Sequence, residues 1–114
     1  MRPWEIVLIV FPFTDLTSVK VRPALVVSSE SQMRQSEDAI FMLISSQLNG
    51  VRPTDFVIQE THAEFPMTGL KKSSVFRSDK IHCLQKRLAR KRLGSIGPIV
   101  QREIINRLEA VLAI

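Results

Sequence analysis

Four side chains in three separate segments have the types that metal-free cleavage of RNA requires. Arg22 lies where a polar loop enters an apolar run, and Ser45 lies where another apolar run ends. Arg77 and Asp79 are two residues apart, so in an extended stretch they project from the same face. The reaction needs a base for the ribose 2′-OH, an acid for the leaving 5′-oxygen and cations for the charge on the phosphorane. Arginine supplies such a cation through a planar fork that matches phosphate oxygens, and a carboxylate supplies a base.

Each of these residues also has a purely structural interpretation when it is taken singly. Arg77 and Asp79 can form a surface ion pair worth at most about 1 kcal/mol, and Ser45 can hydrogen-bond at a strand end. Other chemistries have less support, because the sequence contains no GxGxxG, GxxxxGK[ST] or G-x-S-x-G motif. The neighbours His82 and Cys83 would point to opposite faces of a strand, which makes them a poor catalytic pair.

The charge of the chain predicts a polyanionic or acidic partner. Lys and Arg number 16 against 11 Asp and Glu, which gives a net charge of +5. The stretch 86–92 (KRLARKR) holds five basic residues in seven. It is either a solvated face or an electrostatic track for phosphates, whose binding would depend strongly on salt. Six Phe, one Trp and no Tyr do not support base stacking as the main mode of recognition.

The remaining composition argues against cofactors and membranes. Cys83 is the only cysteine, which excludes an internal disulfide and a multi-cysteine zinc site. With only two histidines beside it, we expect no metal and no other cofactor. No run approaches the ~20 apolar residues that span a bilayer. The N-terminal apolar run is short and contains Pro12, so we interpret it as a strand, not a signal peptide, in a cytoplasmic protein.

The hydrophobic pattern predicts a mainly β protein with one domain over residues 1–114. β-branched runs indicate six strands, at 5–11, 24–28, 39–45, 55–59, 73–77 and 80–84, with a short helix around 32–35. From Pro98 onward, apolar residues recur at helical spacing, and Ile105 and Ile114 widen the stripe. Short connections between strands favour a small, strongly bent antiparallel barrel followed by an amphipathic C-terminal helix.

Five segments together resemble the MazF/PemK (Kid-like) family of toxin endoribonucleases, the mRNA interferases of type II toxin–antitoxin systems. They are 7–15 (VLIVFPFTD), 20–28 (KVRPALVVS), 44–47 (ISSQ), 74–81 (SVFRSDKI) and 92–96 (RLGSI), in the order and spacing of the family. The R-P-A-L-V block is the most specific of them. The resemblance covers nearly the whole chain.

The resemblance implies an SH3-like barrel that forms a symmetric homodimer with an RNA groove along its two-fold axis. Such proteins cleave single-stranded mRNA without a metal and leave a 2′,3′-cyclic phosphate and a 5′-OH. An acidic antitoxin with a largely disordered tail blocks the groove, which suits a chain of charge +5. DNA binding together with the antitoxin is also expected.

The family motifs carry specific roles to this sequence. The resemblance implies that Arg22 binds the scissile phosphate, that Ser45 positions it and that Asp79 is the general base. Arg77 matches the residue that acts as general acid, but a guanidinium gives up its proton only with difficulty, which favours charge stabilisation first and proton donation second. The side chains expected to bind RNA are Thr14, Lys20, Ser46, Gln47, Lys86 and Arg87.

The loop 14–20 departs from the family pattern. It is shorter than in many members and lacks their Gly-His-Glu-type stretch, which leaves the cleavage sequence open. Two other functions stay open on the same barrel. One is a non-enzymatic, DNA gyrase-poisoning (CcdB-like) toxin, and the other is an inactive nucleic-acid-binding barrel.

Overall fold

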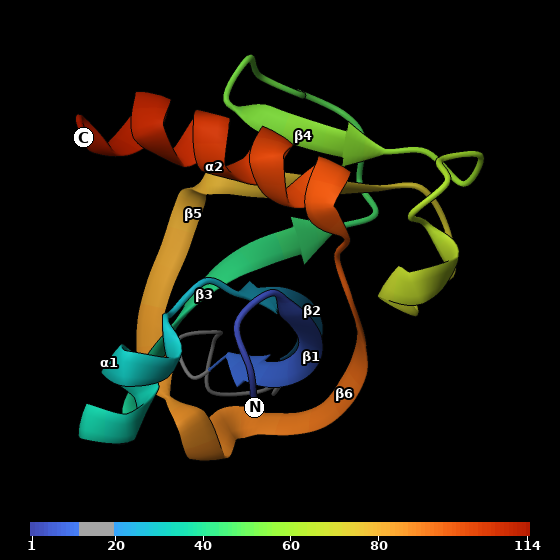
Figure 1. Ribbon diagram of the computed structural model, residues 1–114. Coiled ribbons are helices and arrows are strands. Elements are labelled where there is room, and N and C mark those ends of the chain that lie inside the picture. Colours follow the sequence, from blue (N-terminus) through green and yellow to red (C-terminus); the bar gives the residue numbers. More distant parts are fainter. Residues whose placement is uncertain (12–19) are drawn as a thin grey trace.

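The computed structural model describes residues 1–11 and 20–114, and it confirms a mainly β fold (Figure 1). Within these ranges, six antiparallel strands form one curled sheet in the order β4-β5-β3-β2-β1-β6. The strands are β1 (Glu5–Phe11), β2 (Lys20–Val26), β3 (Asp38–Ser45), β4 (Asp55–Ile58), β5 (Ser74–Gln85) and β6 (Ala89–Ser95). The helices are α1 (Glu30–Gln35) and α2 (Pro98–Leu112), with two 3₁₀ turns, η1 (Pro66–Thr68) and η2 (Lys86–Leu88).

The partition of the last strands differs from the sequence prediction. The segments 73–77 and 80–84 are not two strands but parts of the single bent β5. Met42 of β3 pairs with Ile81 and Ile44 pairs with Phe76, so residues 77–80 of β5 bulge opposite Leu43. A bulge bends a strand without ending it. The polar residues at the bulge therefore divided one strand into two in the sequence prediction. The sixth strand is β6, which begins within the basic stretch 86–92 and ends beyond it, at Ser95.

β2 begins earlier than predicted and contains a proline. Pro23 pairs with Leu8 of β1, whereas pairing with β3 starts only at Ala24. Proline has no N–H to donate, so it is tolerated where one side of a strand has no ladder partner. The segment that includes Arg22 is therefore bonded to β1 alone and projects past the last bonded pair with β3.

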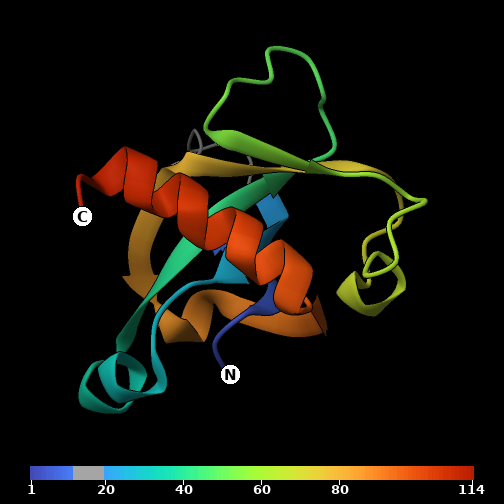
Figure 2. The ribbon, with the colours of Figure 1, turned by 45° about the horizontal axis from the view of Figure 1, so that its top comes forward.

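Two apolar clusters hold the curled sheet together. The larger lies beneath α2 and contains Ile6, Leu25, Met42, Ile44, Ile58, Phe76, Ile96, Val100 and Ile104. The second packs under α1 and contains Val7, Ile9, Phe11, Ala24, Val26, Met33, Ala39 and Phe41. Figure 2 shows α2 lying across the part of the sheet formed by β4 and β5.

The apolar stripe of α2 is only partly buried. Val100 and Ile104 are fully buried and Leu108 packs against them. In contrast, Ile105 is 43% exposed and Ile114 is 81% exposed. The stripe predicted from spacing is thus wider than the face that the barrel covers.

A buried carboxylate fixes the start of α2. Glu64 accepts hydrogen bonds from the backbone N–H groups of Ile99 and Val100, each at 2.9 Å. A carboxylate at this position satisfies free N–H groups and interacts favourably with the helix dipole. The approach requires glycine at position 97, because a Cβ there would lie 2.6 Å from Glu64 Oε2.

We expect Glu64→Ala to lower the free energy of unfolding by about 2 kcal/mol, since two buried N–H groups lose their acceptor. Glu64→Gln keeps one acceptor oxygen and should lose about half as much. Urea unfolding of both variants measures the difference. An alanine variant as stable as the unsubstituted chain would show that the two hydrogen bonds do not stabilise α2.

In the part of the chain that the structure describes, no helix is long and apolar enough to cross a membrane.

Candidate active site

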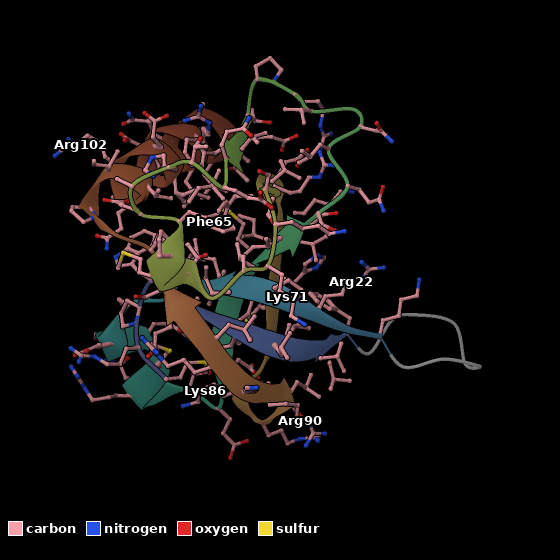
Figure 3. The ribbon with its side chains drawn as sticks, turned by 90° about the vertical axis from the view of Figure 1, so that its right-hand side faces the viewer. Arg22, Phe65, Lys71, Lys86, Arg90 and Arg102 are labelled. Atoms are coloured by element: carbon pink, nitrogen blue, oxygen red, sulfur yellow. The ribbon has the colours of Figure 1, made fainter. Side chains whose placement is uncertain are left out.

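A cavity of about 370 Å³ lies at one opening of the barrel and is rich in cationic side chains. It is bounded by residues of β1, β2, β3, β5 and β6 and by the segment 69–72 after η1. Its described lining includes four cations, Arg22, Lys71, Lys72 and Lys91, and three serines, Ser45, Ser46 and Ser74, but no carboxylate. Figure 3 shows Arg22 and Lys71 close together on the same side of the molecule. Four cations and three hydroxyls with no acid favour an anionic ligand such as phosphate.

The sheet register brings Arg22 and Ser45 together. Ala24 pairs with Leu43, so the same antiparallel register, continued by two residues, places Arg22 opposite Ser45. β3 ends at Ser45, whose Oγ accepts a hydrogen bond of 3.0 Å from the Gln47 N–H. The strand end therefore turns away from the sheet and leaves Ser46 at the cavity.

Gly69 sets the position of the two lysines on the opposite side. Its φ of 71° is a left-handed conformation that favours glycine. A Cβ at this position would also collide with the Leu93 carbonyl oxygen of β6. This close approach lets the segment with Lys71 and Lys72 lie against the barrel opening.

Arg77 does not line the cavity; it is enclosed by the loop that follows β3. Its side chain is 13% exposed, and its Nη1 forms an ion pair of 2.8 Å with Asp55 Oδ2. Arg77 also donates to backbone carbonyl oxygens of the loop. Nη2 donates to Gln47 at 3.1 Å and Asn49 at 3.4 Å, and Nη1 donates to Gly50 at 3.5 Å. Arg77 and Asp55 are direct cross-strand partners of β5 and β4, so the sheet itself fixes this pair.

Asp79 pairs with a residue of the same loop. Its Oδ1 accepts a hydrogen bond of 2.8 Å from Arg52 Nη2, and the Asp79 side chain is 32% exposed. Arg52 Nε lies 3.8 Å from Asp55 Oδ2, the oxygen that also binds Arg77. Arg77, Asp55, Arg52 and Asp79 therefore form one chain of alternating charges, which we call the ion chain. The surface pair between Arg77 and Asp79 that the sequence allowed is replaced by a pair of Arg77 with Asp55 of β4 and a pair of Asp79 with Arg52 of the loop.

The cavity and the ion chain meet at the end of β3. Ser45 and Ser46 line the cavity, and the next residue, Gln47, accepts from Arg77 through its carbonyl oxygen. Arg22 and Ser45 thus lie at one cavity, whereas Arg77 and Asp79 are not in its described lining and pair with Asp55 and Arg52. Among the side chains expected to bind RNA, Lys20 is exposed at the start of β2, and Thr14 lies outside the described residues.

The family model for the "PemK-like, MazF-like toxin of type II toxin-antitoxin system" matches residues 2–112. The chain belongs to this family. This finding confirms the resemblance carried by the five sequence segments.

Solved structures of PemK/MazF toxins share the fold. A MazE–MazF complex (Form-II) from Deinococcus radiodurans has a TM-score of 0.78 at 22% identity and covers 100% of this chain and 96% of that chain. A mycobacterial endoribonuclease in complex with its cognate antitoxin gives 0.76 at 18% identity, with 100% and 96% covered. The Mycobacterium tuberculosis toxin MazF-mt6 gives 0.76 at 14% identity, with 96% and 97% covered. No curated protein matches the chain by sequence.

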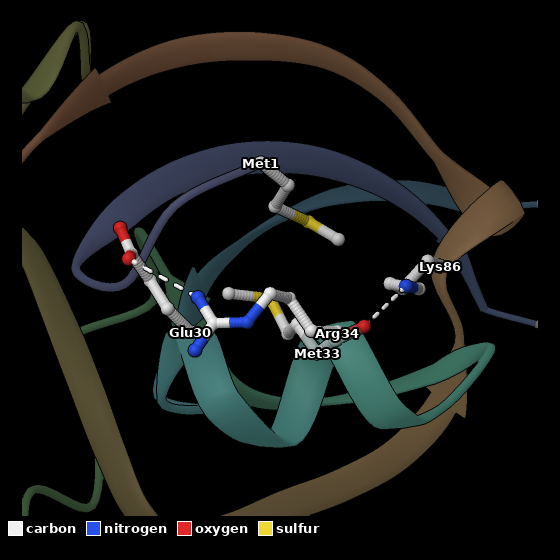
Figure 4. Close-up of a pocket in the computed structure, with 5 residues that line it drawn as sticks. All are labelled: Met1, Glu30, Met33, Arg34 and Lys86. Carbon is white, nitrogen blue, oxygen red and sulfur yellow. Dashed lines mark hydrogen bonds and ion pairs between the residues drawn. The ribbon is translucent and has the colours of Figure 1, made fainter.

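The basic stretch of this PemK/MazF chain lies at a second, larger groove of about 590 Å³. Lys86 and Arg87 line this groove and not the cavity at Arg22. The Lys86 ammonium donates to the Met33 carbonyl oxygen at 2.7 Å, at the end of α1 (Figure 4). Lys91 lines both the groove and the cavity, and so joins the two cationic surfaces.

Glu5 is the acidic side chain in the described lining of this groove, and its charge is matched. Arg92 Nε lies 2.6 Å from Glu5 Oε2, and the Arg2 N–H donates to Oε1 at 2.7 Å. Burial by itself raises the pKa of the Glu5 carboxyl. The hydrogen bonds from Arg2 and Arg92, with the charges of Arg92 and the amino terminus, outweigh burial and hold this pKa below its usual value. The groove therefore stays cationic.

Sequence reasoning did not assign Arg52, Asp55, Lys71, Lys72 or Lys91 to the site. Arg52 and Asp55 are far from Arg77 and Asp79 in sequence, and only the pairing of β4 with β5 brings them together. A signal was present in the turn 52–55 (RPTD), where a cation and an acid flank a proline. In the described part of the chain, no group of three or more His, Cys, Asp and Glu side chains could hold a metal ion.

Proposed function

We propose that this chain is the endoribonuclease toxin of a type II toxin–antitoxin system. In this proposal it cuts single-stranded mRNA without a metal, by attack of the ribose 2′-OH, and leaves a 2′,3′-cyclic phosphate and a 5′-OH. Loss of mRNA stops translation and growth. The observation that carries the proposal is the cavity whose described lining holds Arg22, two serines at the β3 end and three lysines, but no acid.

The cavity supplies the part of the site that binds and stabilises a phosphodiester. The Arg22 guanidinium donates to the non-bridging oxygens, and the charge on these oxygens grows as the phosphorane forms. The Ser45 hydroxyl orients the same phosphate. Lys71, Lys72 and Lys91 hold neighbouring phosphates in a water-exposed rim, where their attraction is weakened by salt.

The ion chain supplies the acid–base part of the proposed site. Asp79 is the general base that takes the 2′-OH proton. Its ordinary basicity is weak for this task, so its contribution rests on placement beside the nucleophile. Arg77 stays a candidate for stabilising the negative charge on the phosphorane, but its terminal nitrogens already donate to Asp55 and to backbone carbonyl oxygens of the loop. We propose that Arg77 acts first by holding the loop that carries Gln47.

The second groove extends the proposed RNA path. Lys91 continues the cavity toward Arg87 and Lys86, and Ser46 lines the cavity itself. The proposal adds Lys20 and Gln47 as further RNA contacts. The same cationic surfaces suit an acidic antitoxin, which would compete with RNA for them. A symmetric homodimer in the cytoplasm, which binds DNA together with the antitoxin, is part of the proposal. The exposed Ile105 and Leu112 of α2, with Ile114 just after it, support a dimer.

Incubation with a long single-stranded RNA in the presence of EDTA tests the proposal. We expect discrete cuts with cyclic phosphate ends, and no cuts in the same RNA carrying 2′-O-methyl groups, because the nucleophile is then blocked. Intact RNA together with inhibited DNA gyrase would favour the gyrase-poisoning alternative. RNA that is bound but stays intact, with active gyrase, would leave an inactive binding barrel.

A further inference from the structure

Arg77 has few donors left with which to reach a substrate. Its two terminal nitrogens serve four acceptors, namely Asp55 Oδ2 and the carbonyl oxygens of Gln47, Asn49 and Gly50. The side chain is 13% exposed, and its ion-pair partner Asp55 is fully buried. Withdrawing Arg77 would leave that carboxylate buried and unpaired, which is costly. The reaction nevertheless needs donors for the charge that grows on the phosphorane, and Arg77 has few to offer.

Arg52 has the properties that Arg77 lacks. Its side chain is 49% exposed, and the one side-chain bond shorter than 3 Å that the structure gives it is Nη2 to Asp79 Oδ1. Its backbone is fixed, because its N–H donates to Asp55 Oδ2 at 2.9 Å and its carbonyl accepts from the Asp55 N–H at 2.9 Å. A fixed backbone with an exposed guanidinium is a pre-organised donor that can turn toward a ligand.

The charges of the ion chain favour such an exchange. Arg77 already compensates Asp55 at 2.8 Å, while Arg52 Nε is 3.8 Å from the same oxygen. Among the described residues, Asp79 is therefore the one close partner of the Arg52 side chain, and an exposed pair of this kind is weakly held. A phosphate offers Arg52 a bidentate acceptor, which matches the guanidinium fork better than one carboxylate oxygen does.

We propose that Arg52 is the second catalytic guanidinium of the site, and that it leaves Asp79 to bind the scissile phosphate. This inference rests on the proposed endoribonuclease function. The transfer has two effects at once. Arg52 stabilises the charge that grows on the phosphorane, and the Asp79 carboxylate becomes free to accept the 2′-OH proton.

The step balances without any further reactant than water. The 2′-oxygen gives its proton to Asp79 and forms a bond to phosphorus. The bond from phosphorus to the 5′-oxygen breaks, and the departing oxygen takes a proton from water. The hydroxide that remains takes the proton from Asp79, which restores the carboxylate, and Arg52 returns to it when the cyclic phosphate end leaves.

The test compares Arg52→Ala with Arg34→Ala in single-turnover cleavage of RNA. Arg34 is a matched control, because it is an exposed arginine that also forms an ion pair, at 3.8 Å with Glu30 of α1 (Figure 4). Both variants lose one positive charge. Arg34→Ala loses its pair with Glu30, and Arg52→Ala loses its pair with Asp79 and its 3.8 Å contact with Asp55. We expect Arg52→Ala to lower the cleavage rate about 10²-fold, as for loss of one donor to the transition state. Arg34→Ala should stay within about twofold of the unsubstituted chain. Arg52→Lys, which keeps a point charge without the fork, should fall between.

A double variant separates contact with phosphate from mere positioning of Asp79. If Arg52 binds phosphate, Arg52→Ala lowers the rate further in an Asp79→Asn background, whereas a residue that acts only through Asp79 adds nothing there. The melting temperature of Arg52→Ala should stay within a few degrees of the original. An unchanged rate, an equal loss in Arg34→Ala, or no further loss in the double variant would each overturn the role of Arg52. Cleavage by the unsubstituted chain would still uphold the proposed function in those cases, and intact RNA with that chain would remove both.

Discussion

Replacing Arg22 by alanine is expected to lower the rate of RNA cleavage about 10²- to 10³-fold while the fold is retained. The reason is the place of Arg22 in the cavity. It lies on the part of β2 that is bonded to β1 alone, opposite Ser45, and it is exposed. Its loss removes a donor from the developing phosphorane but leaves both apolar clusters intact. Single-turnover cleavage and thermal unfolding of the same preparation measure the two effects.

Two variants control for charge and for shape. Arg102→Ala removes the same charge from an exposed position on α2, away from the cavity in Figure 3, and should leave the rate unchanged. Arg22→Lys keeps the charge but not the planar fork, so it should recover only part of the rate. Full activity of Arg22→Ala would place the reacting phosphate elsewhere than in this cavity. An equal loss in Arg102→Ala would reduce the role of Arg22 to general attraction of RNA.

The strands of the barrel could be predicted largely because their local pattern and their burial agree. The run 5–11 is rich in Ile and Val. Its buried side chains belong to the two apolar clusters, Ile6 to the larger and Val7, Ile9 and Phe11 to the second. The start of α2 is likewise local, because Pro98 fits a first helical turn and Val100 and Ile104 follow at helical spacing. Local propensity is sufficient to predict a strand or helix wherever the tertiary contacts stabilise the same conformation.

The errors arise where tertiary contacts decide. The stretch 77–80 is polar and resembles a turn, but pairing with β3 on both sides keeps it within β5 as a bulge. Ile105 has an apolar side chain on α2, yet the barrel is too narrow to cover it. In both cases the residue types fit either outcome, a turn or a bulge at 77–80 and a buried or an exposed side chain at Ile105. Only contacts with other parts of the fold decide between them.

The candidate site divides in the same way. Arg22 and Ser45 could be picked out from sequence, since each lies at the edge of an apolar strand and in a segment that resembles the family, although only the register of β2 with β3 brings them together. The partner of Arg77 could not, because Asp55 reaches it through the pairing of β4 with β5 across 22 residues. The Arg-x-Asp spacing suggested that Arg77 and Asp79 act together. In the structure each binds a residue of the loop after β3, and the loop becomes part of the site.

Asp79→Asn is expected to lower the cleavage rate about 10²- to 10⁴-fold, the range for loss of a general base. The amide keeps the size of the carboxylate and one oxygen for Arg52, but it cannot accept the 2′-OH proton. Affinity for RNA should change little, because Asp79 contributes no donor to phosphate. The binding measurement uses RNA with 2′-O-methyl groups, which presents the same phosphates without the nucleophile.

The alternative role for Asp79 is to hold Arg52 in place, and the two roles predict different results. A positioning residue would show its loss in affinity as well as rate, because a misplaced Arg52 binds phosphate less well. A base would show the loss in rate alone. Stability serves as the internal control, since the pair with Arg52 is exposed enough that losing its charge should cost less than about 1 kcal/mol of unfolding free energy. A normal rate with weakened binding would remove Asp79 from the chemistry and leave the base to be sought elsewhere in the chain.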